Sequence, residues 1–320
     1  MRVVSLLPSA TEILFALGLN HEIVGISHEC DFPPQARARR VVIQSRIPHD
    51  ATPLEIDTQV REYVKRGESL YAVDAQALEE LNPDLIVTQD LCHVCAASPD
   101  DLATAISRFR QAPEVLCLNP QNLEGVWSDI KKVGEKTHSG KNAEALIAKI
   151  KTHLNEIATA VNHQLKSGAV RPKVAFLEWL QPFYVGGHWI PEMLALAGAE
   201  DLFGKPAQPT FRVTEEQIIA AAPEIILISP CGYTAQQALQ EYLAMPHSTE
   251  WNAIPAVRQN RVYALEANSY FSRPGPRLDT GVEILAKLAH PAITASTEAQ
   301  SAILPIANVA TQNQAVTAKP

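Results

Sequence analysis

The stretch LEELNPDLIVTQDLC, residues 78–92, has a second copy later in the chain, IIAAAPEIILISPC, residues 218–231. Each copy reads as the end of a helix, a proline, an acid, an apolar strand and a loop with a cysteine. A second pair repeats in the same order, TEILFALG at 11–18 and PEMLALAG at 191–198, and each copy follows a strand-like run. Two repeats in one order predict two similar α/β lobes.

A long helix is predicted between the two copies, over residues 142–165. Its apolar residues recur every three or four positions, which is typical of one face of an α-helix. At about 1.5 Å per residue the helix reaches about 35 Å, enough to cross from one lobe to the other. A shorter helix is expected over residues 123–136. The apolar residues that define the long helix are Leu146, Ile150, Leu154, Ile157, Val161 and Leu165.

The predicted fold class is α/β, with two similar lobes of mostly parallel sheet joined by one long helix, because strands and helices alternate along the chain. We expect an N-terminal lobe at 1–120, linker helices at 121–168 and a C-terminal lobe at 169–290. The tail at 291–320 is rich in Ala, Thr, Ser, Gln and Asn and has no aromatic residue. It buries little apolar area by this pattern, so we expect it to be disordered.

Composition excludes two classes of partner. The chain has 320 residues, 19 % charged residues and a net charge of −8, which is typical of a globular protein with two cores. The acidic balance, without a basic stripe, argues against nucleic-acid binding. Every apolar run is far shorter than the roughly 20 residues that span a bilayer.

The N-terminus, MRVVSLLPSATEILFALG, reads as a strand followed by a helix rather than as a secretory signal. Ser9 and Glu12 have the spacing of a capping box, and Gly18 stands where the helix would end. We therefore expect a cytoplasmic protein, or a periplasmic one if the start codon is misassigned. Five cysteines, an odd number, also fit a reducing compartment.

Polar and aromatic side chains follow most of the predicted strands. Ligands of open parallel sheets bind beyond the carboxyl ends of the strands. If the strand ends of the two lobes face each other, they form a cleft suited to a large, flat, partly apolar ligand. The candidate ligand contacts from this pattern are Ser9, His28, Asp31, Arg46, Asp90, His93, Trp179, His188, Trp189, Tyr233 and Arg273.

The motifs CDFPPQA at 30–36, NPDLIV, EWLQPFYVGG and NSYFSRPGPRL occur in the order lobe, helix, lobe. This order resembles the helical-backbone substrate-binding proteins of ABC importers, in particular their cobalamin-binding and iron-chelate-binding branch. The resemblance covers about residues 1–290 and implies a non-enzymatic monomer that binds a small metal chelate. By position it also implies ligand contacts by Tyr71, Trp179, Phe183, Phe211, Tyr270 and Arg273.

Two features depart from that family. Its members are normally exported, and this chain has no readable signal. They also dock on an ABC permease through one glutamate on each lobe, and the matching positions here are Gln76 and Glu216, so one acid is replaced by an amide. Glu79 and Glu80 lie about one turn further on. These departures favour a cytoplasmic carrier or sensor, with a permease as a further candidate partner.

The loop DLCHVC contains Cys92 and Cys95, spaced like half of a zinc or Fe–S site. Cys30 and Cys231 also follow strands, so the four thiols are the candidate metal ligands. The alternatives are thiols that merely pack as small apolar side chains, a site that binds metal directly, thiols that ligate the metal of a bound cobalamin or iron chelate, and a redox disulfide. No cofactor is required by any motif.

Catalysis is the least favoured hypothesis. His28 lies next to Glu29 and has the chemistry of a general base, but no Ser or Cys nucleophile is tied to it by a motif. The sequence therefore predicts a binding protein for a corrinoid or metal chelate and not an enzyme. A metal or Fe–S protein that uses its Cys and His side chains directly is the alternative.

Overall fold

The computed structural model describes residues 1–48, 51–89, 99–107 and 109–306. The chain forms two compact units. Unit 1 contains Met1–Lys149 and Pro274–Pro276, and unit 2 contains Ile150–Arg273 and Arg277–Pro320. The unit boundary falls inside the long helix, and the segment 274–276 joins the first unit. The four predicted segments place their boundaries instead at 120/121, 168/169 and 290/291.

Unit 1 is built on a six-stranded sheet with the order β4-β3-β2-β1-β5-β6. All neighbours are parallel except β3 and β4, which are antiparallel. The central strand β1 is buried because Val3 and Val4 are fully covered. The strands are β1 Val3–Ser5, β2 Ile23–Ser27, β3 Arg40–Ser45, β4 Tyr71–Val73, β5 Leu85–Gln89 and β6 Glu114–Leu118. The helices are α1 Pro8–Ala16, the 3₁₀ helix η1 Pro34–Ala38, α2 Pro53–Arg66, α3 Ala75–Leu81, α4 Pro99–Ile106 and α5 Leu123–Lys136.

Unit 2 is built on a seven-stranded sheet with the order β10-β8-β7-β11-β12-β13, and β9 pairs with β7 beside this path. β7, β11 and β12 are parallel, whereas β8, β10 and β13 pair antiparallel with their neighbours. The strands are β7 Lys173–Leu180, β8 Phe183–Val185, β9 Glu200–Asp201, β10 Phe211–Arg212, β11 Ile225–Ile228, β12 Val262–Leu265 and β13 Ile303–Ile306. The helices are α7 Ile190–Leu196, α8 Glu215–Ala221, α9 Ala235–Ala244, α10 Thr249–Asn252, α11 Pro255–Arg258, α12 Ala267–Tyr270, α13 Leu278–Ala289 and α14 Thr297–Ser301.

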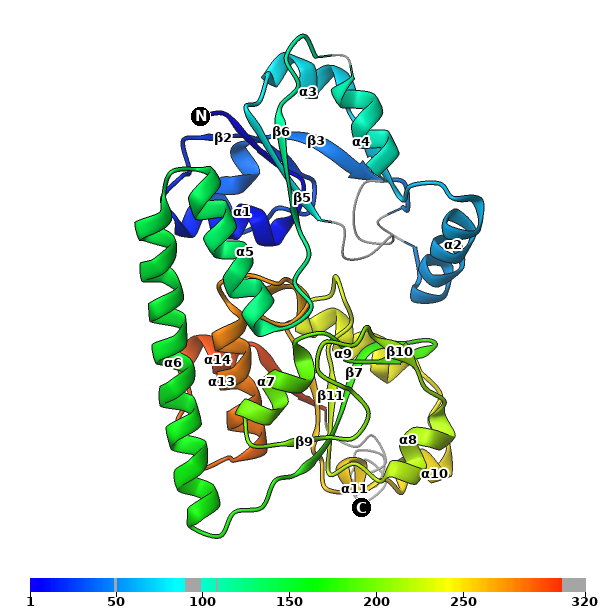
Figure 1. The fold of residues 1–320 in the computed structure, drawn as a ribbon. Helices are drawn as coiled ribbons and strands as arrows, with labels where there is room; N and C mark the ends of the chain where they lie inside the picture. The colour runs from blue at the N-terminus through cyan, green and yellow to red at the C-terminus, as the bar shows by residue number, and fades with distance from the viewer. Residues whose placement is uncertain (49–50, 90–98, 108, 307–320) are drawn as a thin grey trace, which may run out of the picture. The chain divides into compact units, whose positions relative to one another are not determined.

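The predicted long helix is confirmed as α6, Gly140–Lys166, which has 27 residues (Figure 1, green). Its predicted apolar face is the buried one, since Ile150, Leu154, Ile157 and Val161 are all covered. The shorter helix is confirmed as α5, with both predicted ends. The predicted fold class, α/β with two similar lobes of mostly parallel sheet joined by one long helix, is therefore confirmed.

The internal repeat is visible in the backbone. The C-cap residues of α3 and α8, Asn82 and Ala222, are both in the left-handed conformation, and a proline and a buried strand follow each. α1 and α7 both begin with a proline in their first turn, and both are followed by a left-handed glycine, Gly18 and Gly198. The two units thus share cap geometry as well as sequence.

The predicted capping box of Ser9 and Glu12 is wrong. The N-cap residue of α1 is Leu7, which makes no side-chain capping bond, and Pro8 occupies the first turn. The fixed φ of proline suits this position, so the helix begins before Ser9. Ser9 and Glu12 therefore lie inside the helix, where both are buried.

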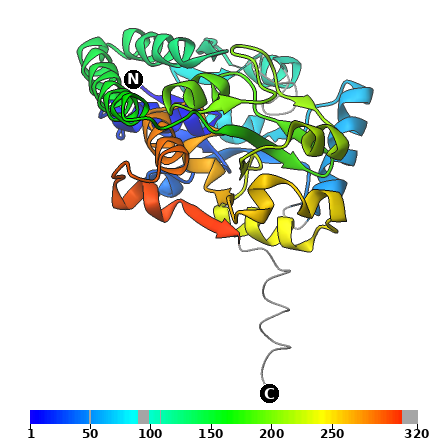
Figure 2. The same cartoon turned by 90° about the horizontal axis from the view of Figure 1, so that it is seen from below.

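The predicted disordered tail is wrong for residues 297–306. They form α14 and β13, and β13 pairs antiparallel with β12 at the sheet edge (Figure 2, orange-red). The Ser296 hydroxyl caps α14 by accepting the backbone N–H of Ala299. Ile306 is buried in the core of unit 2, so a few aliphatic residues supply the burial that the average composition concealed. Residues 307–320 lie outside the described part of the chain.

Candidate functional site

In unit 1, three predicted contact residues meet at one edge of the sheet. β4 begins at Tyr71, which pairs with Ser45 at the end of β3, directly before Arg46. The rings of His28 and Tyr71 lie 6.0 Å apart. His28 is held by a 3.1 Å contact from Nδ1 to the Ile43 carbonyl oxygen. The exposed Arg46 and the half-buried Asp31 complete this edge.

Phe32, in the loop after β2, was missed by the sequence analysis. Its side chain is 40 % exposed, which is unusual for a large aromatic residue. It lies next to Asp31, so the loop after β2 presents an aromatic ring as well as a carboxylate. The DFPP motif is the sequence signal for Phe32, although in the sequence analysis the motif supports only the family resemblance.

In unit 2, the ends of three parallel strands converge on two aromatic rings. Trp179 lies near the end of β7, and Tyr233 follows β11, with their ring centroids 5.7 Å apart in an edge contact. The side-chain amide of Asn268, after β12, donates to the Gly232 carbonyl at 2.9 Å. Trp179 Nε1 donates to the Gln181 carbonyl at 3.1 Å. Both rings are half-buried and thus present one surface outward.

Strand pairing adds two residues that the sequence analysis missed. Trp179 pairs with Tyr184 on β8, and Tyr184 pairs with Arg212 on β10. Residues that are paired across strands share a face of the sheet. We call Trp179, Tyr184, Arg212 and Tyr233 the strand-end surface. Two-residue strands such as β10 give no periodic signal, so the sequence could not have indicated Arg212.

Phe211 does not join this surface. It pairs with Val185, which pairs in turn with the buried Leu177, so Phe211 lies on the opposite face from Tyr184. Its side chain is nevertheless 41 % exposed because β10 is at the sheet edge. Phe211 and Trp179 therefore lie on opposite faces of the sheet, and the ligand contact predicted for Phe211 stays a prediction.

Three predicted aromatic contacts are buried within unit 2 itself. Phe183 stacks on Trp251 with a centroid distance of 5.4 Å and belongs to the core. Trp189 is buried, and its Nε1 donates to the Phe271 carbonyl at 2.8 Å. Tyr270 is buried and donates to Glu298, and both burial and this carboxylate raise its pKa to about 12. These rings stabilise the unit and offer little surface to a ligand.

Glu178 lies in a β-bulge, where the pairing of β7 with β8 shifts between Leu177 and Trp179. A bulge re-aims the side chain of the extra residue. The carboxyl group accepts hydrogen bonds from the Gly187 N–H and the Thr210 hydroxyl, yet burial raises its pKa to about 8. The neighbouring Asp201 raises it further. An acid inside an apolar strand was the sequence signal for this residue.

The glycines of the FYVGGHW segment are required by close packing above Glu178. A Cβ on Gly187 would lie 2.4 Å from the Thr210 backbone nitrogen. The next residue, His188, has a φ of 52° and stacks on Trp189, and burial lowers its pKa. His188 is therefore held neutral beside the core, with its Nδ1 buried and without a hydrogen-bond partner.

The described thiols do not form a metal site. Cys30 is buried in unit 1 and accepts a 3.0 Å hydrogen bond from the Thr11 hydroxyl, whereas Cys231 is exposed in unit 2. Within the described ranges, no three His, Cys, Asp or Glu side chains are arranged to bind a metal ion. Four predicted site residues, Asp90, Cys92, His93 and Cys95, lie outside the described residues. Ser9 is buried in α1, and Arg273 is half-buried beside the turn at 274–276.

The two predicted docking positions are equivalent. Gln76 and Glu216 are the second residues of α3 and α8, and both are exposed. The pKa of Glu216 is lowered by a hydrogen bond from Thr214. Gln76 donates to Glu80 at 2.9 Å, and Glu80 also pairs with Arg40 at 2.6 Å. Glu80 thus has two local partners, and the neighbouring Glu79 is also exposed.

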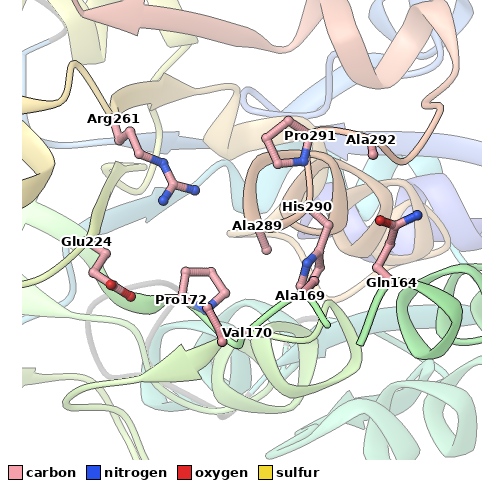
Figure 3. Close-up of a pocket in the computed structure, with 10 residues that line it drawn as sticks. All are labelled: Gln164, Ala169, Val170, Pro172, Glu224, Arg261, Ala289, His290, Pro291 and Ala292. Atoms are coloured by element: carbon pink, nitrogen blue, oxygen red, sulfur yellow. The ribbon is translucent and has the colours of Figure 1, made fainter. Parts of the chain in front are cut away.

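A hollow of about 420 Å³ lies at the opposite end of the unit 2 strands (Figure 3). Pro172, Glu224 and Arg261, which directly precede β7, β11 and β12, form part of its wall. Glu224 accepts the Lys173 N–H at 2.8 Å, and Arg261 donates to the Leu288 carbonyl at 3.2 Å. Small apolar residues make up most of the remaining lining, so this hollow offers no aromatic wall for a flat ligand. Its lining is Gln164, Ala169, Val170, Pro172, Glu224, Arg261, Ala289, His290, Pro291 and Ala292.

Comparison with known sequences gives one family over most of the chain. The model of a family described as periplasmic binding protein matches residues 3–268. A substrate-binding lipoprotein of an ABC transporter, YvrC of Bacillus subtilis, is 27% identical over 299 residues, which is 91% of this chain and 80% of the relative. A vitamin B12-binding protein of Vibrio cholerae is 24% identical over 287 residues, 88% of this chain and 86% of the relative.

Solved structures share the fold. A periplasmic heme-binding protein from Pseudomonas aeruginosa has a TM-score of 0.71 at 20% identity and covers 92% of this chain and 95% of its own. The vitamin B12-binding protein BtuF of Vibrio cholerae has a TM-score of 0.62 at 20% identity, with coverages of 90% and 96%. In the part of the chain that the structure describes, none of the helices has the length and apolar character needed to cross a membrane.

Proposed function

The chain belongs to the periplasmic binding protein family, and from this premise we propose that it binds a cobalamin-like corrinoid or another tetrapyrrole metal chelate. The resemblance inferred from the sequence is confirmed by the family match. Members of the family are substrate-binding proteins, so the chain is a binder and not an enzyme. No resident cofactor is part of this proposal.

The strand-end surface of unit 2 is the observation that carries the proposal. Trp179, Tyr184 and Tyr233 provide aromatic faces, and a flat conjugated ring gains both apolar burial and favourable stacking against such faces. Arg212 pairs with Tyr184 across the two strands and supplies a cation for a carboxylate or phosphate at the ligand periphery. His28, Arg46 and Tyr71 of unit 1 form a second set with similar chemistry.

An absorption titration tests the proposal. Protein purified without oxygen is titrated with hydroxocobalamin and, separately, with hemin, and the spectrum of the protein alone is the zero point. We expect saturable binding of one of the two chelates. A shifted ligand band would identify an axial His, Cys or Tyr ligand, and an unshifted band would indicate stacking alone. The absence of saturable binding by both chelates would refute the proposal.

A matched pair of variants locates the binding surface. We expect Trp179→Ala to weaken binding about tenfold, because a stacking ring and its buried area are lost. Phe211→Ala removes a more exposed ring from the opposite face of the same sheet and is expected to bind like the wild type. If the two variants weaken binding equally, the strand-end surface is not the ligand-binding surface.

A permease is the proposed partner of unit 2. Glu216 offers an exposed charge at the start of α8, whereas the equivalent Gln76 of unit 1 is neutral. We infer a one-sided docking contact that is weaker than one with two acids. Co-purification with an ABC permease should therefore increase for Gln76→Glu and decrease for Glu216→Gln. A cytoplasmic carrier without a permease would respond to neither change, and cell fractionation tests the location directly.

A further inference from the structure

The hollow of unit 2 in Figure 3 has two half-buried charges of opposite sign in its wall. Glu224 directly precedes β11 and Arg261 directly precedes β12, and these two strands are parallel neighbours in the sheet. The N–H of Ile226 donates to the Arg261 carbonyl at 3.1 Å, so the backbones beside the two charges are joined. Neighbouring strands lie about 5 Å apart, so a carboxylate and a guanidinium reach one hollow from adjacent positions.

Glu224 and Arg261 do not neutralise each other. One carboxyl oxygen of Glu224 accepts the Lys173 N–H at 2.8 Å, on the side of β7. Arg261 donates instead to the Leu288 carbonyl of α13 at 3.2 Å. Within the described ranges, neither side chain forms an ion pair. A half-buried charge has lost part of its hydration, so each of the two groups favours an opposite charge supplied by a ligand.

The remaining lining of the hollow is apolar and firmly held. Val170 is 76 % exposed, and an apolar side chain in this state gains free energy when a ligand covers it. His290 is buried, and its Nε2 lies 3.2 Å from the Gly198 carbonyl oxygen. Lys287 Nζ donates to the Pro291 carbonyl at 2.7 Å. These bonds fix the wall, so a ligand meets a preformed site.

We propose that this hollow binds an α-amino acid with an apolar side chain. Arg261 binds the carboxylate, Glu224 binds the ammonium group, and the apolar lining covers the side chain. An α-amino acid has both charges on one carbon atom, which suits partners on neighbouring strands. The volume of about 420 Å³ lies within the range of about 300–1,000 Å³ that is typical of small-molecule pockets.

The amino-acid site is separate from the strand-end surface. The hollow lies where the parallel strands of unit 2 begin, whereas Trp179 and Tyr233 lie where they end. From Pro172 to Trp179 the chain advances about 20 Å at about 3.3 Å per residue. The inference therefore goes beyond the proposed function, and its test needs no metal chelate.

Three related probes test whether both charges of the ligand are recognised. L-leucine has both charges, L-leucinamide lacks the carboxylate, and N-acetyl-L-leucine lacks the ammonium group. Binding of each probe to the full chain is titrated by saturation-transfer NMR. We expect leucine to bind saturably and each analogue to bind about tenfold more weakly, because one charge-assisted hydrogen bond is lost. Equal binding of the three probes, or no saturable binding of leucine, would overturn the inference.

Two variants assign the two contacts. Glu224→Gln keeps an acceptor for the Lys173 N–H, and Arg261→Gln keeps a donor for the Leu288 carbonyl. We expect Arg261→Gln to weaken leucine binding about tenfold and to leave leucinamide binding unchanged. Glu224→Gln should weaken leucine binding to the same degree and leave N-acetyl-leucine binding unchanged. A variant that weakens all three probes equally would contradict the assigned contact.

Matched controls separate this site from a general effect of charge. Arg258→Gln and Glu250→Gln each remove an exposed charge of unit 2 outside the hollow and should bind leucine like the wild type. Arg261→Lys keeps a cation and should retain part of the preference for leucine over leucinamide, even if Arg261→Gln unfolds. Loss of leucine binding in the two controls, or loss of the preference in Arg261→Lys, would overturn the inference.

Discussion

Glu178 gives the stability of unit 2 an unusual dependence on pH. The carboxyl group accepts two hydrogen bonds, which favour the charged form, but desolvation outweighs them and raises its pKa from 4.5 to about 8. Asp201 is shifted in the same direction by burial. An acid whose folded-state pKa is raised binds more protons in the folded protein than in the unfolded chain. Stability therefore falls as pH rises from about 4.5 to about 8.

Glu178→Gln tests this pH response. The amide oxygen can accept the same two hydrogen bonds, and the amide does not titrate. We expect the variant to be close to the wild type at pH 4.5 and more stable by a few kcal/mol at pH 8. Thermal unfolding at several pH values measures the difference. A difference that stays constant across this range would show that Glu178 is ionised in the folded protein.

At the scale of elements, the equivalent helices α3 and α8 of the two units have the same left-handed C-cap conformation. The residue type at the cap differs between them. α3 ends with Asn82, a residue type that tolerates the left-handed region. α8 ends with Ala222 at a φ of 47° and a ψ of 57°, where the methyl group is strained. The proline that follows each cap prevents the helix from continuing. The cap of unit 2 is thus less well matched to its backbone than the cap of unit 1.

Ala222→Gly is expected to raise the free energy of unfolding by about 0.5 to 1 kcal/mol, because relief of left-handed strain exceeds the entropy that glycine adds to the unfolded chain. The control Ala221→Gly changes the last residue of α8 and should lower the free energy of unfolding by about 0.5 to 1 kcal/mol. Urea denaturation of both variants measures the two effects. Equal losses in both would mean that the cap at residue 222 carries no strain.

At the scale of the whole molecule, each unit has its own hydrophobic core and its own sheet. Separate cores allow separate unfolding transitions in calorimetry. β13 belongs to unit 2 although it lies far along the chain from β7. Its Ile306 is 4 % exposed and packs with the residues of β11 and β12 in the core. The C-terminal strand is thus a structural part of unit 2.

Ile306→Ala should destabilise unit 2 by about 2 to 4 kcal/mol, since a buried side chain is replaced by a cavity. Ile303→Ala, at a half-exposed position of the same strand, should cost less than about 1 kcal/mol. Calorimetry should show the unfolding transition of unit 2 at a lower temperature, while the transition of unit 1 keeps its temperature. A shift of both transitions by the same amount would show that the units unfold together.

The sequence by itself determined the features that depend on local periodicity. α6 was predicted because one helical face is apolar, and the repeated motifs predicted two similar units. Strand ends predicted His28, Trp179 and Tyr233 as candidate ligand contacts, whereas Tyr71 came only from the family resemblance. These features repeat over a few residues, so neighbours in the chain carry the information.

Only the tertiary structure decided which aromatic rings are buried and which acids are neutral. Phe183, Trp189 and Tyr270 follow strands as the exposed rings do, yet partners distant in sequence cover them. The elevated pKa values of Glu178 and Asp201 arise from desolvation by elements that the chain brings together only on folding. Likewise β13 forms because β12 offers an unpaired edge. Burial and hydrogen bonding are properties of the assembled sheet, and no local pattern contains them.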